Sequence, residues 1–317
     1  MRVGLALAQR AAVLVVSLVV ASVIVFVICA VLPGDTARVI LGVEADQEAV
    51  DRLRSELDLD RPLPAQYASW ASGLVRGDFG ESPVTQVDIG QQIGDRLGVT
   101  LSLVIGGMVV AALIAIPLGL LAAVRQRRAS GAGLTLLSQI GLAIPSFWAG
   151  ILLAYLFGVR LGWLPANGYV NLRENAWEWM RHLLLPWLAL GIVQGAVLMR
   201  YVRSAILDVM REDYMRTARA MGRTSTSALW RHGVRNAAIP VLTVLGLQLS
   251  TLLVGAIIIE SVFTLPGVGT MLLQGVANRD LLLVQGTVIV LVALVLTVNW
   301  LVEVLYVVVD PRLRATA

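Results

Sequence analysis

The chain has 317 residues, of which 57% are hydrophobic and 15% are charged, and its formal net charge is +4. Soluble domains contain about 25% charged residues, so this composition, with a mean hydropathy of +0.80, predicts a polytopic membrane protein. All 25 basic residues are arginine, and a Walker A phosphate loop needs a lysine. The chain is therefore expected not to hydrolyse ATP itself.

Residues that build metal sites, disulfides and nucleophilic centres are scarce. Cys29 is the only cysteine, which excludes an intrachain disulfide. The two histidines, His182 and His232, lie far apart in the sequence, so no histidine-based metal site is expected. No nucleic-acid module is recognisable. An intramembrane enzyme would need a paired nucleophile and base, and no candidates for them are found.

Six apolar runs are candidates to cross the roughly 30 Å hydrocarbon core of a membrane. The first, residues 11–32, carries no charge over 22 positions and follows Arg2 and Arg10. We expect it to be a retained span rather than a cleaved signal peptide, whose apolar core is shorter. The other predicted spans are residues 99–124, 134–159, 183–199, 237–259 and 281–309. The predicted fold class is an all-α membrane protein with six transmembrane helices.

Proline and glycine interrupt several of these runs. Pro117 predicts a kink in the second span, and Pro145 falls halfway along the third. In the fourth span, Gly191 and Gly195 are spaced to permit the close approach of another helix.

Charge predicts the sidedness of the loops. Residues 33–97, the longest polar segment, hold 12 acids and 6 arginines, whereas 15 of the 25 arginines fall near the chain ends or in residues 125–128 and 200–235. Cytoplasmic loops are rich in arginine, so both termini are predicted to be cytoplasmic and residues 33–97 external. Within that external segment we expect one helix at residues 47–57 and an amphipathic helix around Tyr67, Trp70 and Leu74.

Residues 208–240 form an arginine-rich loop with six arginines and three acids. Met210, Tyr214, Ala218 and Met221 share one side of a predicted helix, and Gly222 can end that helix in a left-handed cap. Thr224 or Ser225 is expected to cap a second helix over residues 226–238, and Pro240 to open the next span. The loop is either a topology signal alone or a docking surface for a soluble partner.

Two sequence stretches resemble a known family. Tyr214-Met-Arg-Thr-Ala-Arg-Ala-Met-Gly222 and Arg231-His-Gly-Val-Arg-Asn-Ala-Ala-Ile-Pro240 are similar to the EAA loop of binding-protein-dependent ABC importer permeases. Arg216-Thr217-Ala218 stands at the Glu-Ala-Ala position of that loop, so Ala218 and Gly222 are the strict matches. Four further stretches resemble the dipeptide/oligopeptide branch and its first, B-type, subunit: Leu32-Pro-Gly-Asp35, Leu59-Asp-Arg-Pro-Leu63, Gln66-Tyr67 and Arg76-Gly-Asp-Phe-Gly80.

The resemblance implies a type I importer permease in the cytoplasmic membrane of a prokaryote. Residues 1–98 would form the first helix and external segment, and residues 99–317 a five-helix core with a coupling loop at 205–238. The implied partners are a second homologous permease, two cytoplasmic ATPases that hold ATP and Mg²⁺, and an extracytoplasmic solute-binding protein. The chain itself would bind no cofactor and no nucleic acid, and it would form half of an alternating-access pathway for peptides or related small solutes. Gly191, Gly195, Gly246 and Gly255 are expected to supply close contacts to the second permease.

The resemblance also implies functional residues. It assigns ATPase coupling to Tyr214, Arg216, Thr217, Ala218, Arg219, Gly222, Arg231, His232 and Arg235. The small side chain of Ala218 is expected to enter a cleft on the ATPase. A gate or binding-protein contact is assigned to Asp35, Glu260, Phe263, Pro266, Gly267 and Gly269.

A few polar residues within the spans are candidates to line a pathway. They are Gln139, Ser146, Gln194, Gln248, Ser250 and Asn299, and each is alternatively a partner in a helix–helix hydrogen bond. Glu260 and Glu303, near span ends, are either functional carboxylates or structural pairs. A secondary transporter or channel that works without an ATPase remains the alternative function, but it would predict inverted repeats and midplane charges that are not evident.

Overall fold

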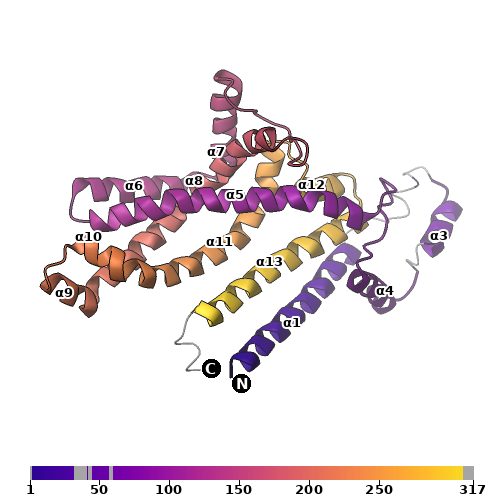
Figure 1. Ribbon diagram of the computed structural model, residues 1–317. Coiled ribbons are helices and arrows are strands. Elements are labelled where there is room, and N and C mark those ends of the chain that lie inside the picture. Colours follow the sequence, from indigo (N-terminus) through magenta and orange to yellow (C-terminus); the bar gives the residue numbers. More distant parts are fainter. Residues whose placement is uncertain (1, 32–40, 42–44, 57–59, 310–317) are drawn as a thin grey trace. The chain divides into compact units, whose positions relative to one another are not determined.

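A computed structural model describes residues 2–31, 41, 45–56 and 60–309. Within these ranges the regular structure is helical, apart from an isolated bridge between Glu81 and Asp88 (Figure 1). Asp35, the Leu32–Asp35 motif and the chain end after residue 309 lie outside the described residues. By its internal contacts the chain divides into two compact units.

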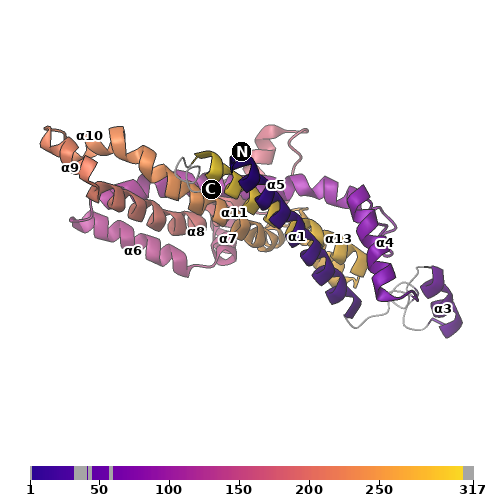
Figure 2. The ribbon, with the colours of Figure 1, turned by 90° about the horizontal axis from the view of Figure 1, so that it is seen from below.

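The first unit comprises residues 1–7, 100–265 and 298–317. Its helices are most of α5 (Ile89–Val124), α6 (Ala129–Ala143), α7 (Ser146–Leu153), the π-helix η1 (Ala154–Arg160), α8 (Ala176–Arg211), α9 (Asp213–Ala220), α10 (Ser225–Ala228), the π-helix η2 (Leu229–Gly233) and α11 (Val234–Val262). The contacts between α8 and α6, α7 and α11 are extensive, and Figures 1 and 2 show α6 running beside α8. The centre of this unit is therefore α8.

The second unit comprises residues 8–99 and 266–297. It contains most of α1 (Arg2–Val31), α3 (Gln47–Glu56), α4 (Leu63–Arg76), the start of α5, α12 (Val268–Ala277) and most of α13 (Leu281–Val309). α5 and α13 thus contribute to both units, and the domain boundary expected at residue 98 stays a prediction.

The six predicted spans are found when a bent helix pair is counted as one. Five helices are long and apolar enough to cross a membrane: Leu7–Val31, Ile89–Val124, Ala176–Arg211, Val234–Val262 and Leu281–Val304. The sixth is the pair Ala129–Ala143 and Ser146–Arg160, which is bent by 96°. Two spans continue well past the predicted ends, because α5 begins at Ile89 and α8 reaches Arg211.

Proline acts differently at different positions. Ile144 is extended (φ −91°, ψ 119°) and Pro145 directly precedes α7, because a residue before proline is pushed out of the helical region. Pro117 and Pro186 instead lie inside continuous helices. Pro240 also lies inside a helix, α11, so the expectation that it opens the span was wrong. The helix predicted at residues 226–238 likewise runs through η2 into α11 without a break.

Glycines bring α5 and α8 close together in the first unit. A Cβ atom on Gly191 would lie 2.6 Å from Cβ of Val110, and one on Gly106 would lie 2.5 Å from Cδ1 of Trp187. Real Cβ atoms do not approach so closely, so both sites need glycine. The indole Nε1 of Trp187 also donates to the carbonyl oxygen of Ser102 at 2.9 Å, which orients the ring against α5.

The small-residue faces expected to contact a second permease are therefore occupied within this chain. Gly191 packs against Val110, as described above, and a Cβ atom on Gly195 would lie 3.3 Å from the Ala111 carbonyl oxygen. A Cβ atom on Gly246 would lie 2.9 Å from Cβ of Val302, and one on Gly255 would lie 3.4 Å from Leu190. The close approach was correctly predicted, but its assignment to a partner subunit was wrong.

In the second unit, α4 folds against α1 through aromatic rings. The ring of Phe26 lies 5.5 Å from that of Tyr67 and 5.8 Å from that of Trp70, centroid to centroid. The hydroxyl groups of Ser22 and Tyr67 share a hydrogen bond of 2.9 Å. The helices expected at residues 47–57 and around Tyr67 are confirmed as α3 and α4.

A buried hydrogen bond joins the segment before α5 to the start of α13. Ser82 Oγ donates to Asp280 Oδ2 at 2.5 Å, and Asp280 Oδ1 accepts from the backbone N–H of Leu283 at 3.0 Å. Asp280 thus caps α13 as it holds Ser82. Ile89 and Met271, both buried, pack in the same unit.

Candidate functional site

The arginine-rich loop has the predicted helix–turn–helix form. α9 ends at Ala220, and Gly222 adopts a left-handed conformation (φ +85°). The backbone N–H of Gly222 donates to Arg219 O at 3.0 Å and that of Arg223 donates to Ala218 O at 3.3 Å, which is the hydrogen-bond pattern of a Schellman cap. Oγ1 of Thr224 then accepts from the N–H of Ser227 at 3.3 Å and caps α10, as predicted.

The residues of α9 that pack inward are not the set that the sequence placed on one side of the helix. Met215 is 1% exposed and Ala218 is 3% exposed, and both belong to a core cluster with residues of α8. Tyr214 and Met221, expected on the same side of the helix as Ala218, are 38% and 72% exposed. The expectation that Tyr214, Ala218 and Met221 share one side was therefore wrong, because Ala218 packs inward beside Met215 while the other two are exposed.

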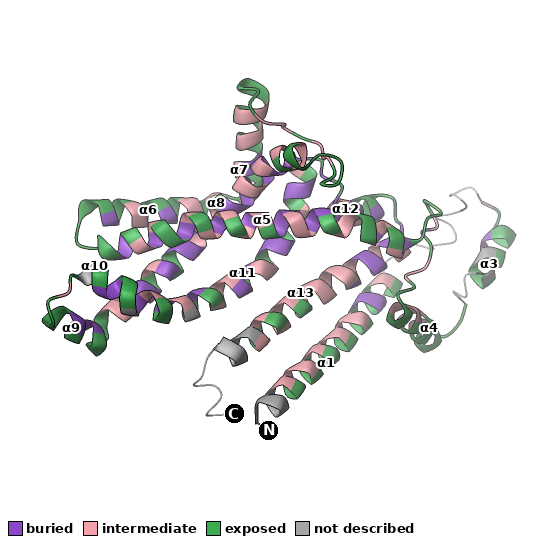
Figure 3. Ribbon diagram, in the orientation of Figure 1, coloured by how far each residue is buried: buried purple, intermediate pink, exposed green. Residues whose placement is uncertain are grey.

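This burial changes the expected role of Ala218. Its methyl group packs against the protein's own core, so in this conformation it does not enter a cleft on another subunit. A larger residue at this position is expected to push α9 away from α8. The face of α9 that is open to a partner is the opposite, exposed one (Figure 3).

We call the exposed surface of this segment the loop face. It consists of Tyr214, Arg216, Thr217, Arg219, Met221 and Trp230. Two of these residues are large and apolar: Met221 is 72% exposed and Trp230 is 63% exposed. Neither had been assigned a contact role from the sequence. The signal in the sequence for such a contact role is a large apolar residue within a cluster of arginines.

Local contacts hold the polar residues of the loop face in place. The side-chain N–H of Asn236 donates to the hydroxyl of Tyr214 at 3.0 Å, and Oγ1 of Thr217 donates to Asp213 O at 3.1 Å. Arg216 pairs with Asp213 at 3.3 Å, and both side chains are well exposed, so the ion pair stabilises the helix little. Arg231 and Arg235 are also exposed, and the side chain of His232 lies outside the described residues.

We expect Gly222→Val to disorder the end of α9. Valine at φ +85° is strained by its branched Cβ, although no atom lies within 4 Å of the Cβ position. Strain of about 1–3 kcal/mol would appear as faster protease cleavage at the exposed arginines of the loop. Gly133→Val, at another glycine with nothing within 4 Å but without a positive φ, is the control. Equal cleavage rates in the two variants would contradict the prediction.

The residues assigned to a gate or an external contact are mostly buried. In the first unit, Glu260 is 0% exposed and accepts from Oγ1 of Thr100 at 2.5 Å, and Phe263 is 1% exposed. In the second unit, Gly267 and Gly269 are buried, and Pro266 is exposed. Glu260 and Phe263 therefore present no surface to an external protein in this conformation, and their role in a gate stays a prediction. Glu260 makes the structural pairing considered from the sequence.

The pathway candidates divide by environment. Oγ of Ser250 donates to Oδ1 of Asn299 at 2.8 Å, so this pair forms the helix–helix hydrogen bond that was the alternative. Gln248 is 6% exposed, and neither amide atom has a hydrogen-bond partner within the described ranges. Ser146 and Gln194 are half-buried and Gln139 is exposed. The pathway role of these residues stays a prediction.

Comparison with known proteins agrees with this architecture. The family model described as "Binding-protein-dependent transport system inner membrane component" matches residues 115–315. A companion model for the N-terminal part of such membrane components matches residues 5–104. Together the two models cover nearly the whole chain. The chain therefore belongs to the family of binding-protein-dependent transport system inner membrane components.

Several relatives are similar over almost their full length. A probable peptide ABC transporter permease protein of Sinorhizobium fredii is 36% identical over 290 residues, 92% of this chain and 93% of that protein. A putative peptide transport system permease protein of Brucella abortus is 39% identical over 306 residues, covering 96% and 98%. The glutathione transport system permease protein GsiC of Salmonella typhi is 40% identical over 302 residues, covering 95% and 96%.

A solved structure shares the fold. It is the crystal structure of an amino acid ABC transporter with histidines, with a TM-score of 0.50 and 18% identity, over 68% of this chain and 93% of that chain.

Family membership and fold make this protein a multi-pass permease subunit of an ATP-driven importer, a translocation component without an ATPase site of its own. It works in a membrane with ATPase and binding-protein components. The alternative of a transporter without an ATPase is not favoured.

Proposed function

We propose that this chain forms half of an alternating-access pathway for peptides or related small solutes. The observation that carries the proposal is its 36–40% identity, over more than nine-tenths of its length, to permeases named for peptide or glutathione transport. A second homologous permease would supply the other half, and it would contact other surfaces, because the glycine faces of this chain pack inside its own fold. Two ATPases would hold the ATP and Mg²⁺.

The loop face is the proposed contact with the ATPase. Arginines around two exposed apolar side chains, Met221 and Trp230, combine the groups that are enriched in binding hot spots. The same arginines support a cytoplasmic position for the loop and both termini, in the inner membrane of a bacterium. Closure of the ATPases on ATP would draw the loops together and open the pathway outward, and hydrolysis would reset it.

The test is uptake by the complete transporter reconstituted in liposomes with its binding protein. Radiolabelled dipeptide or tripeptide is expected to accumulate when ATP is present inside, and unlabelled peptide is expected to compete where free amino acids do not. A complex that contains this chain and accumulates amino acids or sugars but no peptide would disprove the substrate class. The same result would leave the assignment as a permease intact.

We expect Trp230→Ala to uncouple ATP hydrolysis from uptake. Truncation of an interface tryptophan typically costs about 2 kcal/mol or more, so the affinity for the ATPase is expected to fall about 30-fold. The matched control is Trp177→Ala, since Trp177 is 62% exposed and Trp230 is 63% exposed. Affinity for the purified ATPase and peptide-stimulated hydrolysis are the measurements. Equal effects of the two substitutions would show that the loop face is not the contact.

A further inference from the structure

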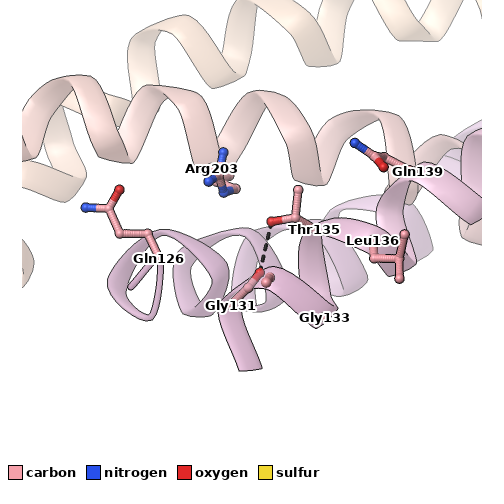
Figure 4. A pocket seen from close by; sticks show the side chains of 8 residues that line it. Gln126, Gly131, Gly133, Thr135, Leu136, Gln139 and Arg203 are labelled. Atoms are coloured by element: carbon pink, nitrogen blue, oxygen red, sulfur yellow. Dashed lines mark hydrogen bonds between the residues drawn. The ribbon is translucent and has the colours of Figure 1, made fainter. Parts of the chain in front are cut away.

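An open pocket of about 540 Å³ lies in the first unit, lined by α8, by α6 and by the turn that leads into α6. Figure 4 shows Arg203 between the ribbons of α8 and α6, with Gln126 on one side and Gln139 on the other. The lining residues are Gln126, Gly131, Ala132, Gly133, Thr135, Leu136, Gln139 and Arg203. No acidic residue is among them, so Arg203 is the one ionised side chain of the lining.

The guanidinium of Arg203 lacks a hydrogen-bond acceptor at one buried position. Its Nε atom is inaccessible to solvent and has no partner in the described part of the chain. A buried donor without an acceptor costs about 1–3 kcal/mol, and more when it is charged. The hydroxyl of Thr135 does not relieve it, because that hydroxyl donates to Gly131 O at 2.9 Å. Because Arg203 lines the pocket and no acidic residue does, the pocket favours a ligand that brings anionic oxygen acceptors to the guanidinium.

The surroundings of the pocket are cationic at one end and apolar along the helix. Arg125, Arg127 and Arg128 are exposed in the turn before α6, and α6 itself carries no charged residue. Leu136 and Leu137 are 57% and 55% exposed on α6. A ligand with a negative head and a hydrocarbon tail matches both parts. Free phosphate matches only the first.

We propose that this pocket binds the phosphodiester headgroup of an anionic phospholipid. The guanidinium of Arg203 donates to phosphate oxygens, a pairing to which its planar fork is suited, and an acyl chain lies along Leu136. Small residues leave room for the headgroup, since no atom lies within 4 Å of a Cβ position on Gly133. The arginine-rich turn places the site at the cytoplasmic leaflet, where basic pockets between helices bind anionic headgroups. This placement rests on the sidedness proposed above.

The experiment measures lipid retained by the purified, complete transporter. Complexes are exchanged into nanodiscs of phosphatidylglycerol and phosphatidylcholine, released, and examined by native mass spectrometry. Arg203→Gln is expected to reduce retained phosphatidylglycerol at least about fivefold, with phosphatidylcholine unchanged, and Arg203→Lys is expected to restore part of it. The matched control is Arg200→Gln, which removes the same charge from the same helix. Arg200 is exposed and lies 5.3 Å from the ring centre of Tyr201, so its loss is expected to leave lipid retention unchanged.

A second variant tests the pocket without touching the arginine. Gly133 lines the pocket, is exposed and has no atom within 4 Å of its Cβ position, so Gly133→Leu adds bulk there in a helix that leucine favours over glycine. It is expected to reduce retained phosphatidylglycerol as Arg203→Gln does, and it decides the question if Arg203→Gln fails to fold.

Several results would overturn the proposal. Wild-type retention in Arg203→Gln or in Gly133→Leu would do so, as would equal losses in Arg200→Gln. Stabilisation of detergent-purified complex by inorganic phosphate, without retained lipid, would identify a free anion instead. Dissociation of Arg203→Gln from the second permease with lipid retention unchanged would identify a carboxylate of a neighbouring subunit. Peptide uptake is scored separately, so failure of this inference does not bear on the substrate class.

Discussion

Gly106→Leu is expected to destabilise the first unit strongly. A Cβ atom at this position already lies 2.5 Å from Cδ1 of Trp187, before the rest of the leucine is added. The indole cannot move aside cheaply, because its Nε1 is bonded to Ser102 O and its ring packs edge-on against Trp179, with centroids 5.4 Å apart. Overpacking costs about 1–3 kcal/mol and occasionally more, and we expect the upper end here. The measurement is the fraction of protein that remains monodisperse after heating, determined by size-exclusion chromatography.

The matched control is Gly94→Leu, on the same helix. Nothing lies within 4 Å of a Cβ atom on Gly94, and leucine has the higher helix propensity, so the melting temperature is expected to stay the same or rise. If Gly106→Leu has the same melting temperature as Gly94→Leu and the wild type, the close packing of α5 on α8 is not as described.

The second large effect is expected at the buried hydrogen bond between Thr100 and Glu260. Thr100→Val removes the hydroxyl that donates to Oε1 of Glu260 at 2.5 Å, and both residues are 0% exposed. A polar group buried with one hydrogen bond fewer costs about 1–3 kcal/mol, so the melting temperature is expected to fall by several degrees. The valine methyl occupies almost the same volume, so cavity formation contributes little.

A double-mutant cycle separates this bond from other effects of the substitutions. Thr100→Val, Glu260→Met and the double variant are expected to show a coupling of about 1 kcal/mol, since methionine has a similar shape but no oxygen to accept from Thr100. Ser261→Ala is the control, because Ser261 is exposed and its hydroxyl donates within its own helix to Ile257 O at 3.2 Å. Independent, additive effects of the two substitutions would argue against a direct bond.

The spans were the part of the fold that the sequence predicted best. Long apolar runs leave little choice in a membrane, since every backbone N–H and C=O must be satisfied within the helix. Pro145 was correctly read as an interruption because it restricts the residue before it. The ends of α5 and α8 were missed, since charged residues such as Asp95 and Arg203 were taken for loop although nothing near them stops a helix.

The site was predicted less completely, for a physical reason. Local chemistry determines a cap, so Gly222 and Thr224 were assigned correctly from their residue types. The direction in which a short helix faces depends on distant residues. Ala218 was expected to face a partner, yet Met215 and Ala218 both pack against the core that α8 provides. For a helix as short as α9, the spacing of apolar residues identified neither the packed face nor its direction.

The absence of a break between α10, η2 and α11 has a mechanical consequence. Residues 225–262 form one continuous helical segment, about 57 Å measured along its axis at 1.5 Å per residue, with the loop at one end and Glu260 near the other. A rotation of the loop is therefore coupled to the far end of the segment more directly than it would be through two helices joined by a flexible linker. The wider turn of η2, Leu229–Gly233, is the place where the winding departs from the regular α-helix, and π turns of this kind are frequent at functional sites. If η2 changed to ordinary α-helical winding, α11 would rotate about its axis relative to the loop.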